Sequence, residues 1–207
     1  MKGKLFIISS PSGGGKGTLI KELLKSSSKV GYSVSYTTRE KRVGEEHGKD
    51  YFFVGVDEFK ELIDRDKFIE FAEVHGNFYG TSKSQVEKET SLGNDIILEI
   101  DVQGAKIVQE KFKEAIGVFI LPPSYDVLKT RLTERNTESP EALRIRLSNA
   151  KQEVKACEAF DYIVVNDEVE RAAMDLETIF LAERLRRDRQ QGMIRDILTS
   201  FDSSDND

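Results

Sequence analysis

A glycine-rich turn near the start of the chain constrains the fold more than any other feature. An apolar run at residues 5–8 enters the sequence SSPSGGGKGT at 9–18, and a pattern of apolar residues on one helical face follows at 19–24. Consecutive glycines allow backbone conformations that a Cβ would forbid, so successive N–H groups can turn inward around an anion at the positive end of the helix. Lys16 adds a point charge beside them. The strand, the loop and the helix together predict a phosphate-binding loop.

Two positions of this loop differ from the usual pattern, in which a Gly, four variable residues and Gly-Lys precede Ser or Thr. Ser10 occupies the place of the first Gly. Gly17 occupies the place of the hydroxyl residue that contacts Mg²⁺, and Thr18 follows one position later. The loop therefore predicts phosphate binding without identifying the residue that contacts the metal.

The composition excludes several classes of protein. The 207 residues suffice for one well-packed domain, and 38% hydrophobic with 33% charged residues is typical of a globular protein. No apolar run has the length of a membrane span, and residues 1–4 lead directly into a strand, so we expect a cytoplasmic protein without a membrane partner. A net charge of −6 argues against non-specific nucleic-acid binding. With one cysteine, Cys157, expected to be buried, and two histidines, neither an internal disulfide nor a zinc cluster is predicted.

Strand-length apolar runs alternate with helical patterns in the second half of the chain. The runs lie at 95–101, 116–121 and 162–165, and they are apolar without alternation. Such strands are buried on both faces, which predicts an α/β fold of the P-loop NTPase type, a parallel sheet flanked by helices. Residues 33–81 read instead as short strands and turns, so we expect a small β-rich lobe inserted into this sheet.

We expect a single domain of three parts. The core comprises residues 1–32, 93–123 and 157–198, the inserted lobe spans 33–92, and a helical lid spans 124–156.

Local signals predict where several elements lie. Alternating residues at 32–36 predict one half-buried strand, and Asp57 is expected to cap a short helix. A long helix is expected over 169–191, and the acidic tail at 200–207 is expected to be frayed. The arginine-rich run at 184–189 is expected to lie on the solvated outer face of that helix.

Several ordered segments resemble the nucleoside monophosphate kinases, and among these the guanylate kinase family. The segments are SVSYTTREKR at 33–42, GE at 44–45, GKDYFF at 48–53, FIE at 68–70, NFYGT at 77–81, IDVQG at 100–104 and VND at 165–167. Together with the glycine-rich loop they extend the resemblance over nearly the whole chain. The resemblance implies an enzyme that phosphorylates GMP to GDP with ATP and Mg²⁺, by direct in-line transfer.

The lobe carries all but one of the residues that the resemblance implies for GMP binding, and the exception, Asp101, lies in the core. The full set is Ser35, Arg39, Arg42, Tyr51, Glu70, Tyr79, Thr81 and Asp101. The guanidinium forks of Arg39 and Arg42 fit the oxygens of a monophosphate bidentately. Glu70 is expected to select guanine, because an ionised carboxylate only accepts hydrogen bonds. Guanine offers a ring N–H beside an amino group, whereas adenine has an acceptor at that ring position.

The resemblance combines the glycine-rich loop with arginines of the lid at the ATP site. The implied ATP contacts are Ser10, Pro11, Ser12, Gly13, Gly14, Gly15, Lys16, Gly17, Thr18, Arg131 and Asn166, and the implied catalytic residues are Lys16, Arg39, Arg135 and Arg146. Phosphoryl transfer needs alignment, exclusion of water and neutralisation of charge, and arginines on a mobile lid serve all three. Mg²⁺ is expected on the ATP phosphates, with Thr18 or Asp101 as a contact through water.

Two other functions fit parts of the pattern. An interaction module that resembles guanylate kinase would bind a protein on the lobe, but such modules usually lack a competent phosphate loop. A kinase of another monophosphate is suggested by Gly17-Thr18, which resembles adenylate kinase, and is disfavoured by Glu70. Without the surrounding motifs, the arginines would be read as a solvated basic turn, and Tyr51 and Tyr79 as core residues. The sequence leaves the oligomeric state open.

Overall fold

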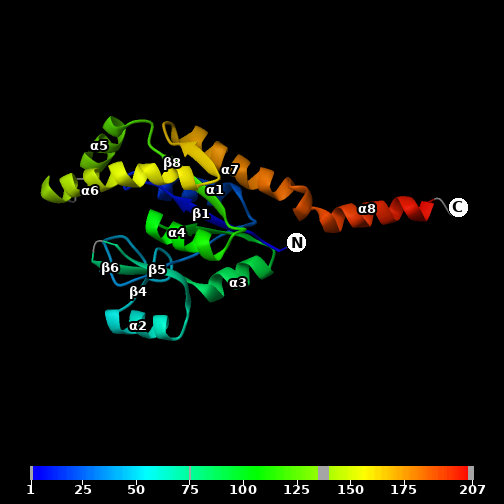
Figure 1. Ribbon diagram of the computed structural model, residues 1–207, viewed down its shortest axis with the longest axis horizontal. Coiled ribbons are helices and arrows are strands. Elements are labelled where there is room, and N and C mark those ends of the chain that lie inside the picture. The colour runs from blue at the N-terminus through cyan, green and yellow to red at the C-terminus, as the bar shows by residue number, and fades with distance from the viewer. Residues whose placement is uncertain (1, 75, 135–139, 205–207) are drawn as a thin grey trace.

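The computed structural model describes residues 2–74, 76–134 and 140–204, and it contains two sheets (Figure 1). The larger sheet has five strands in the order β2-β7-β1-β8-β9, and every neighbouring pair is parallel. Its strands are β1 (Leu5–Ser9), β2 (Val30–Tyr32), β7 (Asp95–Glu99), β8 (Ile116–Leu121) and β9 (Tyr162–Val165). The predicted parallel sheet flanked by helices is confirmed.

Helices cover both faces of this sheet. The helices are α1 (Lys16–Ser26) and α7 (Val169–Leu185) on one face, and α3 (Lys83–Ser91) and α4 (Val102–Lys111) on the other. Side chains alternate along β1, so Phe6 and Ile8 pack under the first pair while Leu5 and Ile7 pack under the second. These four apolar side chains are all buried, which is why this part of the strand reads as a continuous apolar run.

The strand order places a crevice at the end of β1. β1 is followed by α1 on one face of the sheet and β7 by α4 on the other, in the manner of a doubly wound fold, and ligands bind at such a switch point beyond the carboxyl ends of the strands. The glycine-rich loop follows β1, Asp101 follows β7, and Asn166 follows β9. The topology therefore gathers three predicted site segments at one edge.

The smaller sheet has four strands in the order β4-β3-β6-β5 and lies below the core in Figure 1. Its elements are β3 (Tyr36–Thr37), β4 (Phe52–Phe53), α2 (Val56–Asp64), β5 (Phe68–Val74) and β6 (Asn77–Ser82). A cluster of aromatic rings holds it together: Phe59 of α2 stacks on Phe68 and on Phe78, with centroids 4.7 and 5.5 Å apart. The inserted lobe thus has an aromatic core of its own.

Two helices lie on the other side of the crevice from this sheet. They are α5 (Tyr125–Glu134) and α6 (Pro140–Glu153), and a 3-10 turn η1 (Val154–Ala159) leads from α6 to β9. Leu128 and Leu132 of α5 pack with Ala150 of α6 in a small cluster of their own. Lys151 lies 4.8 Å from the centroid of the Tyr125 ring, which adds a cation–π contact between the two helices.

The C-terminal region differs from its prediction. The helix expected over 169–191 ends at Leu185, a 3-10 turn η2 (Arg187–Arg189) follows, and α8 (Gln191–Ser204) then extends away from the body (Figure 1). The tail predicted to fray is helical as far as Ser204, and residues 205–207 lie outside the described part.

The buried carboxylate of Asp95 explains why the turn η2 interrupts the helix. Asp95, which is fully buried, accepts hydrogen bonds from Arg184 Nε and Arg189 Nη2, each at 2.7 Å, and from the Lys4 amide at 2.9 Å. The prediction of a solvated outer face is therefore wrong for these two arginines. The chain breaks its helix so that both guanidinium groups reach one acid.

Three smaller expectations are also corrected. The single strand expected at 32–36 is two strands, because β2 pairs with β7 of the core whereas β3 pairs with β6 of the lobe. Gly55, not Asp57, is the N-cap of α2, and Asp57 lies in its first turn, where a negative charge favours the helix. Cys157 is half-buried rather than buried.

Among the described residues, no helix is long and apolar enough to span a membrane.

Removal of the buried carboxylate is expected to destabilise the fold strongly. Asp95→Ala leaves Arg189, whose side chain is 4% exposed, without its anion, and breaking a buried ion pair in this way costs about 3–5 kcal/mol. Urea unfolding measures the change. Asp175→Ala, an exposed acid on α7, is the matched control and should shift the free energy of unfolding by less than about 0.5 kcal/mol. Equal effects of the two substitutions would contradict the role of the cluster.

Candidate nucleotide-binding site

The glycine-rich loop has the backbone that its sequence predicts. Gly13 and Gly15 have φ of 85° and 94°, in the left-handed region, and the Gly14 amide donates to Pro11 O at 2.9 Å. Gly15 is the N-cap of α1, and Lys16 is its first residue. The loop therefore ends at a helix N-terminus, where backbone N–H groups and the helix dipole favour an anion.

The end of β9 fixes the shape of the loop. Asn166, which is 2% exposed, donates from Nδ2 to Gly14 O at 2.9 Å. A Cβ on Gly15 would lie 2.2 Å from the same Nδ2 atom. Glycine is thus required at this position both by its φ and by the close approach of a neighbouring side chain. Asn166, expected from the resemblance to lie near ATP, contacts the loop directly.

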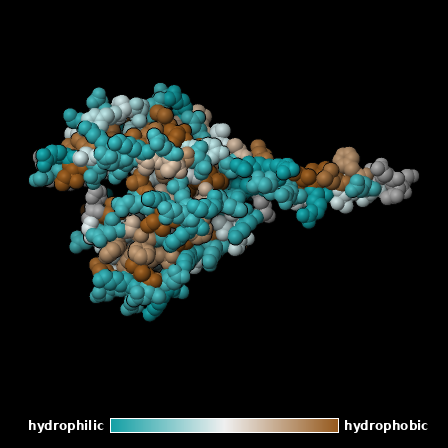
Figure 2. Space-filling model, viewed as in Figure 1, coloured by the Kyte–Doolittle hydropathy of each residue, from teal (hydrophilic) through white to brown (hydrophobic). Residues whose placement is uncertain are grey.

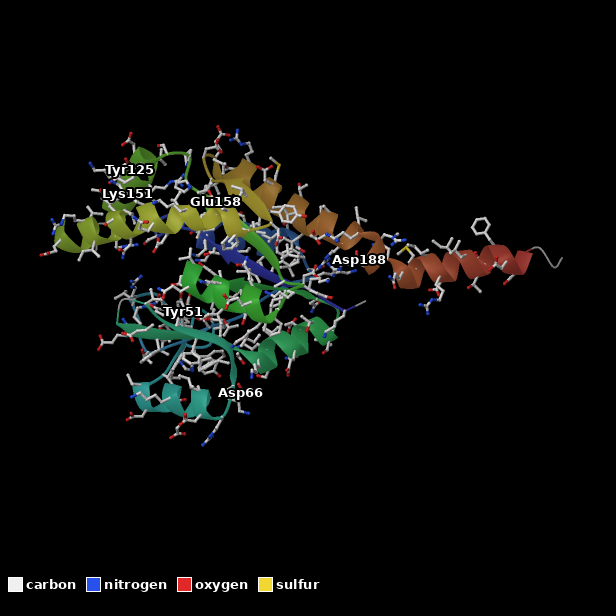
Figure 3. All side chains as sticks on the ribbon, viewed as in Figure 1. Tyr51, Asp66, Tyr125, Lys151, Glu158 and Asp188 are labelled. Carbon is white, nitrogen blue, oxygen red and sulfur yellow. The ribbon has the colours of Figure 1, made fainter. Side chains whose placement is uncertain are left out.

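A cavity of about 300 Å³ lies beside the loop, between α6 and the smaller sheet. Figure 2 shows the hollow between these parts, and Figure 3 shows Tyr51 on the edge of the lobe that faces α4. Nine of the predicted site residues line it: Ser10, Ser12, Lys16, Ser35, Tyr51, Glu70, Tyr79, Asp101 and Arg146. The loop and the lobe therefore contribute to one site.

Glu70 and Thr81 form a buried polar pair at the lobe end of this cavity. Thr81 Oγ1 donates to Glu70 Oε1 at 2.6 Å, and the residues are 0% and 3% exposed, respectively. Burial, with a smaller contribution from the charge of Asp101, raises the pKa of Glu70 to about 7. Its second oxygen lies against the start of α4, 2.9 Å from where a Cβ on Gly104 would stand. A ligand with two adjacent hydrogen-bond donors could bind the Glu70 carboxylate and stabilise its negative charge.

Arg39 is held in place by a carboxylate of its own loop. Its Nη2 donates to both oxygens of Glu45, at 2.8 and 3.1 Å, and the backbone amide of Arg42 donates to Glu45 as well, at 2.9 Å. The guanidinium lies 5.4 Å from the centroid of the Tyr51 ring. Burial raises the pKa of Tyr51 to about 12, so its hydroxyl remains a hydrogen-bond donor at neutral pH.

Helix α6 contacts the glycine-rich loop through charged side chains. Arg146 donates from Nε and Nη2 to Ser12 Oγ at 3.0 and 2.6 Å, and the Ser12 amide donates to Glu153 Oε2 at 2.9 Å. A carboxylate thus accepts from one loop N–H, as a phosphate oxygen would. This contact identifies the Ser12 amide as a donor that faces the cavity.

Arg131 approaches the loop from α5. Its Nη2 donates to Asn166 O at 2.9 Å, while its Nη1 is buried with no hydrogen-bond partner among the described residues. An unpartnered guanidinium nitrogen beside a phosphate loop is a donor available to an anion.

Several predicted residues lie outside the cavity lining. Arg39, Arg42 and Thr81 belong to the lobe around it, and Pro11, Gly13, Gly14, Gly15, Gly17, Thr18, Arg131 and Asn166 belong to the loop or contact it. Asp101 is the N-cap of α4, accepting from the Gly104 amide at 2.8 Å, and still lines the cavity. Arg135 lies outside the described residues.

Sequence reasoning missed three acids of the site. Glu99 and Glu153 line the cavity, and Glu45 positions Arg39. The position of Glu99, at the end of a buried strand and two residues before Asp101, was a signal that could have identified it. Glu99 Oε1 lies 3.7 Å from where a Cβ on Gly17 would be, and Glu99 Oε2 accepts from Tyr32 OH at 3.1 Å.

Comparison with known proteins gives one consistent result. A family model described as guanylate kinase matches residues 2–183. A curated guanylate kinase of Neisseria meningitidis serogroup A is 50% identical over 197 residues, which cover 95% of this chain and 96% of that protein. One from Geobacter sulfurreducens is 46% identical over 198 residues, covering 96% and 98%. A crystal structure of guanylate kinase from Anaplasma phagocytophilum matches with a TM-score of 0.79 at 37% identity, covering 96% of this chain and 95% of that one.

The raised pKa of Glu70 predicts a pH-dependent penalty on stability. Because the pKa is about 7 when folded and 4.5 ordinarily, the folded state is fully favoured below pH 4.5 and loses this stability as the pH rises through 7. The loss amounts to about 3 kcal/mol. Glu70→Gln keeps an acceptor for Thr81 and cannot ionise.

Urea unfolding at pH 5 and pH 8 tests this expectation. The variant should gain stability over the parent protein at pH 8 and gain much less at pH 5. An identical difference at the two pH values would show that Glu70 titrates normally.

Proposed function

This chain belongs to the guanylate kinase family, whose activity is the ATP-dependent phosphorylation of GMP to GDP, and we propose how its residues divide that reaction between them. The observation that carries the proposal is the shared cavity, which has Lys16 and the phosphate loop at one end and the buried Glu70 at the other. In this proposal the chain has three functional parts: a core (1–32, 93–123 and 157–198), a GMP-binding lobe (33–92) and a lid (124–156).

The lobe binds and selects GMP. Glu70 accepts hydrogen bonds from the ring N–H and the amino group of guanine, which adenine cannot offer together. Ser35 and Asp101 line the same end of the cavity, and Thr81 orients Glu70 through its 2.6 Å hydrogen bond. Binding of two donors stabilises the ionised carboxylate and so offsets the effect of burial on its pKa.

The acceptor phosphate binds nearer the loop. Tyr51 and Tyr79 line the cavity and present hydroxyl donors, and Arg39 and Arg42 supply guanidinium donors from the neighbouring turn. Glu45 keeps Arg39 in a fixed orientation. These groups align one phosphate oxygen of GMP for attack.

The loop, α5 and α6 bind ATP. Residues 10–18 hold its phosphates through their backbone N–H groups, except at Pro11, which has none, and the Lys16 ammonium adds its charge. Arg131 and Asn166 contact the nucleotide from the ends of α5 and β9. Arg146 and Arg135 neutralise the charge that spreads over the transferred group. A GMP phosphate oxygen bonds to the γ-phosphorus as the bond to the β,γ-bridging oxygen breaks, and ADP leaves with that electron pair. No covalent enzyme intermediate is formed.

The donor set fits a magnesium ion carried by ATP. Mg²⁺ prefers oxygen ligands and retains several waters, and two carboxylates, Glu99 and Asp101, line the cavity that contains Lys16. Among the described residues no group of three acidic, histidine or cysteine side chains could hold a metal. Glu99, Asp101 or the hydroxyl of Thr18 would hold it through water. The bound ion supplies neutralising charge at the phosphates.

We propose that the reaction serves purine nucleotide metabolism, in the recycling of GMP. We propose a cytoplasmic location, because both substrates are cytoplasmic nucleotides, with ATP and GMP as partners and neither nucleic acid nor membrane among them.

An ADP-release assay with ATP, Mg²⁺ and one of GMP, AMP, UMP or CMP tests the activity. Turnover is expected with GMP alone. Turnover with another monophosphate would overturn the role of Glu70, and no turnover from folded protein would favour an interaction module.

Lys16→Ala should lower kcat roughly 1,000-fold, because it removes a charge at the transferred group. Lys21→Ala, an exposed lysine of the same helix, is the control and should retain activity.

Glu70→Gln should separate the two substrates. The amide turns a donor toward the donors of guanine, so the KM for GMP should rise roughly 30-fold or more while the KM for ATP stays within about twofold. Steady-state kinetics with each substrate varied in turn measures both values. Equal changes in the two constants would argue against base selection by this residue.

A further inference from the structure

Helix α6 presents three residues to the glycine-rich loop and to α5 from one of its faces. Arg146, Ala150 and Glu153 are spaced i, i+4 and i+7, so they lie on one side of the helix. Ala150 is fully buried in the small apolar cluster between α5 and α6. The two charged residues on either side of it both contact Ser12. The polar contacts of this face therefore meet at a single residue of the loop.

The next position of the loop, Gly13, brings α5 close to the loop backbone. A Cβ on Gly13 would lie 2.8 Å from Leu132 Cδ2 and 3.0 Å from Leu128 Cδ1, both on α5. Only a residue without a Cβ allows this helix to pack so closely on the loop. The loop thus meets the two helices through an apolar contact at Gly13 and polar contacts at Ser12.

Each polar contact at Ser12 has the chemistry of a phosphate contact. Glu153 Oε2 accepts from the Ser12 amide at 2.9 Å, so an anionic oxygen lies on a backbone donor of the phosphate loop. Arg146 donates from two nitrogens to Ser12 Oγ, so an oxygen lies within its guanidinium fork. A phosphate group supplies charged oxygens for both of these donors at once.

The Glu153 carboxylate is held at the loop by this one contact. Within the part of the chain that the structure describes, it forms no ion pair and accepts only from the Ser12 amide. The Lys16 ammonium lines the same cavity, and it too forms no ion pair with a described residue. Displacement of the carboxylate therefore breaks one hydrogen bond and takes no anion away from a cation among these residues.

We propose that Glu153 competes with the γ-phosphate of ATP for the Ser12 amide, so that the loop distinguishes a triphosphate from a diphosphate. This inference rests on the proposed function. Ser12 lines the cavity that also contains Glu70 and Tyr79, so its amide lies where the transferred phosphate passes between the two nucleotides. The γ-phosphate displaces the carboxylate from this amide. ADP lacks the γ-phosphate, so Glu153 keeps the amide when ADP is bound.

The competition couples the bound nucleotide to the contacts of α6. With ATP, Arg146 exchanges Ser12 Oγ for an oxygen of the γ-phosphate, and with ADP both charged side chains stay on Ser12. After transfer the γ-phosphate has become part of GDP, and the carboxylate returns to the amide when GDP leaves. Glu153 is thus a positioning residue, which acts on ATP through Ser12 and takes no part in making or breaking bonds.

Isothermal titration calorimetry with ADP or the β,γ-imido analogue of ATP, each with Mg²⁺, tests the proposal. In Glu153→Gln the neutral amide binds the Ser12 N–H less tightly than a carboxylate and does not repel a phosphate. The variant should bind the ATP analogue roughly tenfold more tightly than the parent and change ADP binding by less than about threefold. Glu158→Gln, an exposed acid in the turn after α6 (Figure 3), is the matched control and should change neither affinity.

Glu153→Asp separates the contact from the charge. Aspartate keeps the negative charge and is one methylene too short to reach the Ser12 amide in the same geometry. This variant should also bind the ATP analogue more tightly, by about threefold or more, with ADP binding unchanged. Tightening in Glu153→Gln alone would mean that only the charge matters, and it would overturn the competition for the amide.

Three other results would overturn the inference and leave GMP phosphorylation in place. If Glu153 only shapes the loop, Glu153→Gln should weaken the binding of both nucleotides equally. If its charge acts on all phosphates alike, both nucleotides should bind more tightly by the same factor. If the contact is incidental, neither affinity should change. A parent protein that binds neither nucleotide would instead overturn the proposed function together with this inference.

Discussion

The site depends on the contact between Asn166 and the backbone of the glycine-rich loop. The side chain reaches from the end of β9 to Gly14 O and lies where a Cβ on Gly15 would stand. The loop is therefore held from the sheet and from α1 at once, before any ligand arrives. Donors fixed in this way need no reorganisation when charge develops on a phosphate, which is the main requirement of phosphoryl transfer. The arginines of α5 and α6 then act on a loop whose shape is already set.

The parallel sheet could be predicted because buried strands give continuous apolar runs, and the loop because glycines at positive φ leave a local signature. The division of residues 32–36 between β2 and β3 could not be predicted. Residues 32–36 alternate as one strand would, but strand pairing is decided by distant partners, Ile97 of the core for Tyr32 and Gly80 of the lobe for Tyr36. Likewise, the run at 184–189 has the composition of a solvated helix face. Only the tertiary position of Asp95 turns two of its arginines inward.

Motifs identified the nucleotide-facing residues better than the residues that position them. Arg39 and Glu70 lie in segments whose order along the chain is informative. Glu45 also lies in one of these segments, but its role was not indicated, and Glu153 lies in none; an acid in a charged loop or on a helix surface is usually solvated. Their importance follows from geometry, with oxygens 2.8 Å from Arg39 and 2.9 Å from the Ser12 amide. Acids that preorganise cations or amides are thus found from contacts.

The partners of the buried Asp95 are synthesised at different times, which affects folding during translation. Its carboxylate is completed by the Lys4 amide, near the start, and by Arg184 and Arg189, which are 89 and 94 residues farther along. Chains are synthesised from the N-terminus at about 5–20 residues per second, so the acid leaves the ribosome several seconds before either arginine. During that interval β7 carries a charge with no counter-ion, which disfavours its burial. The buried charge of Asp95 is therefore fully compensated only once residue 189 has been translated.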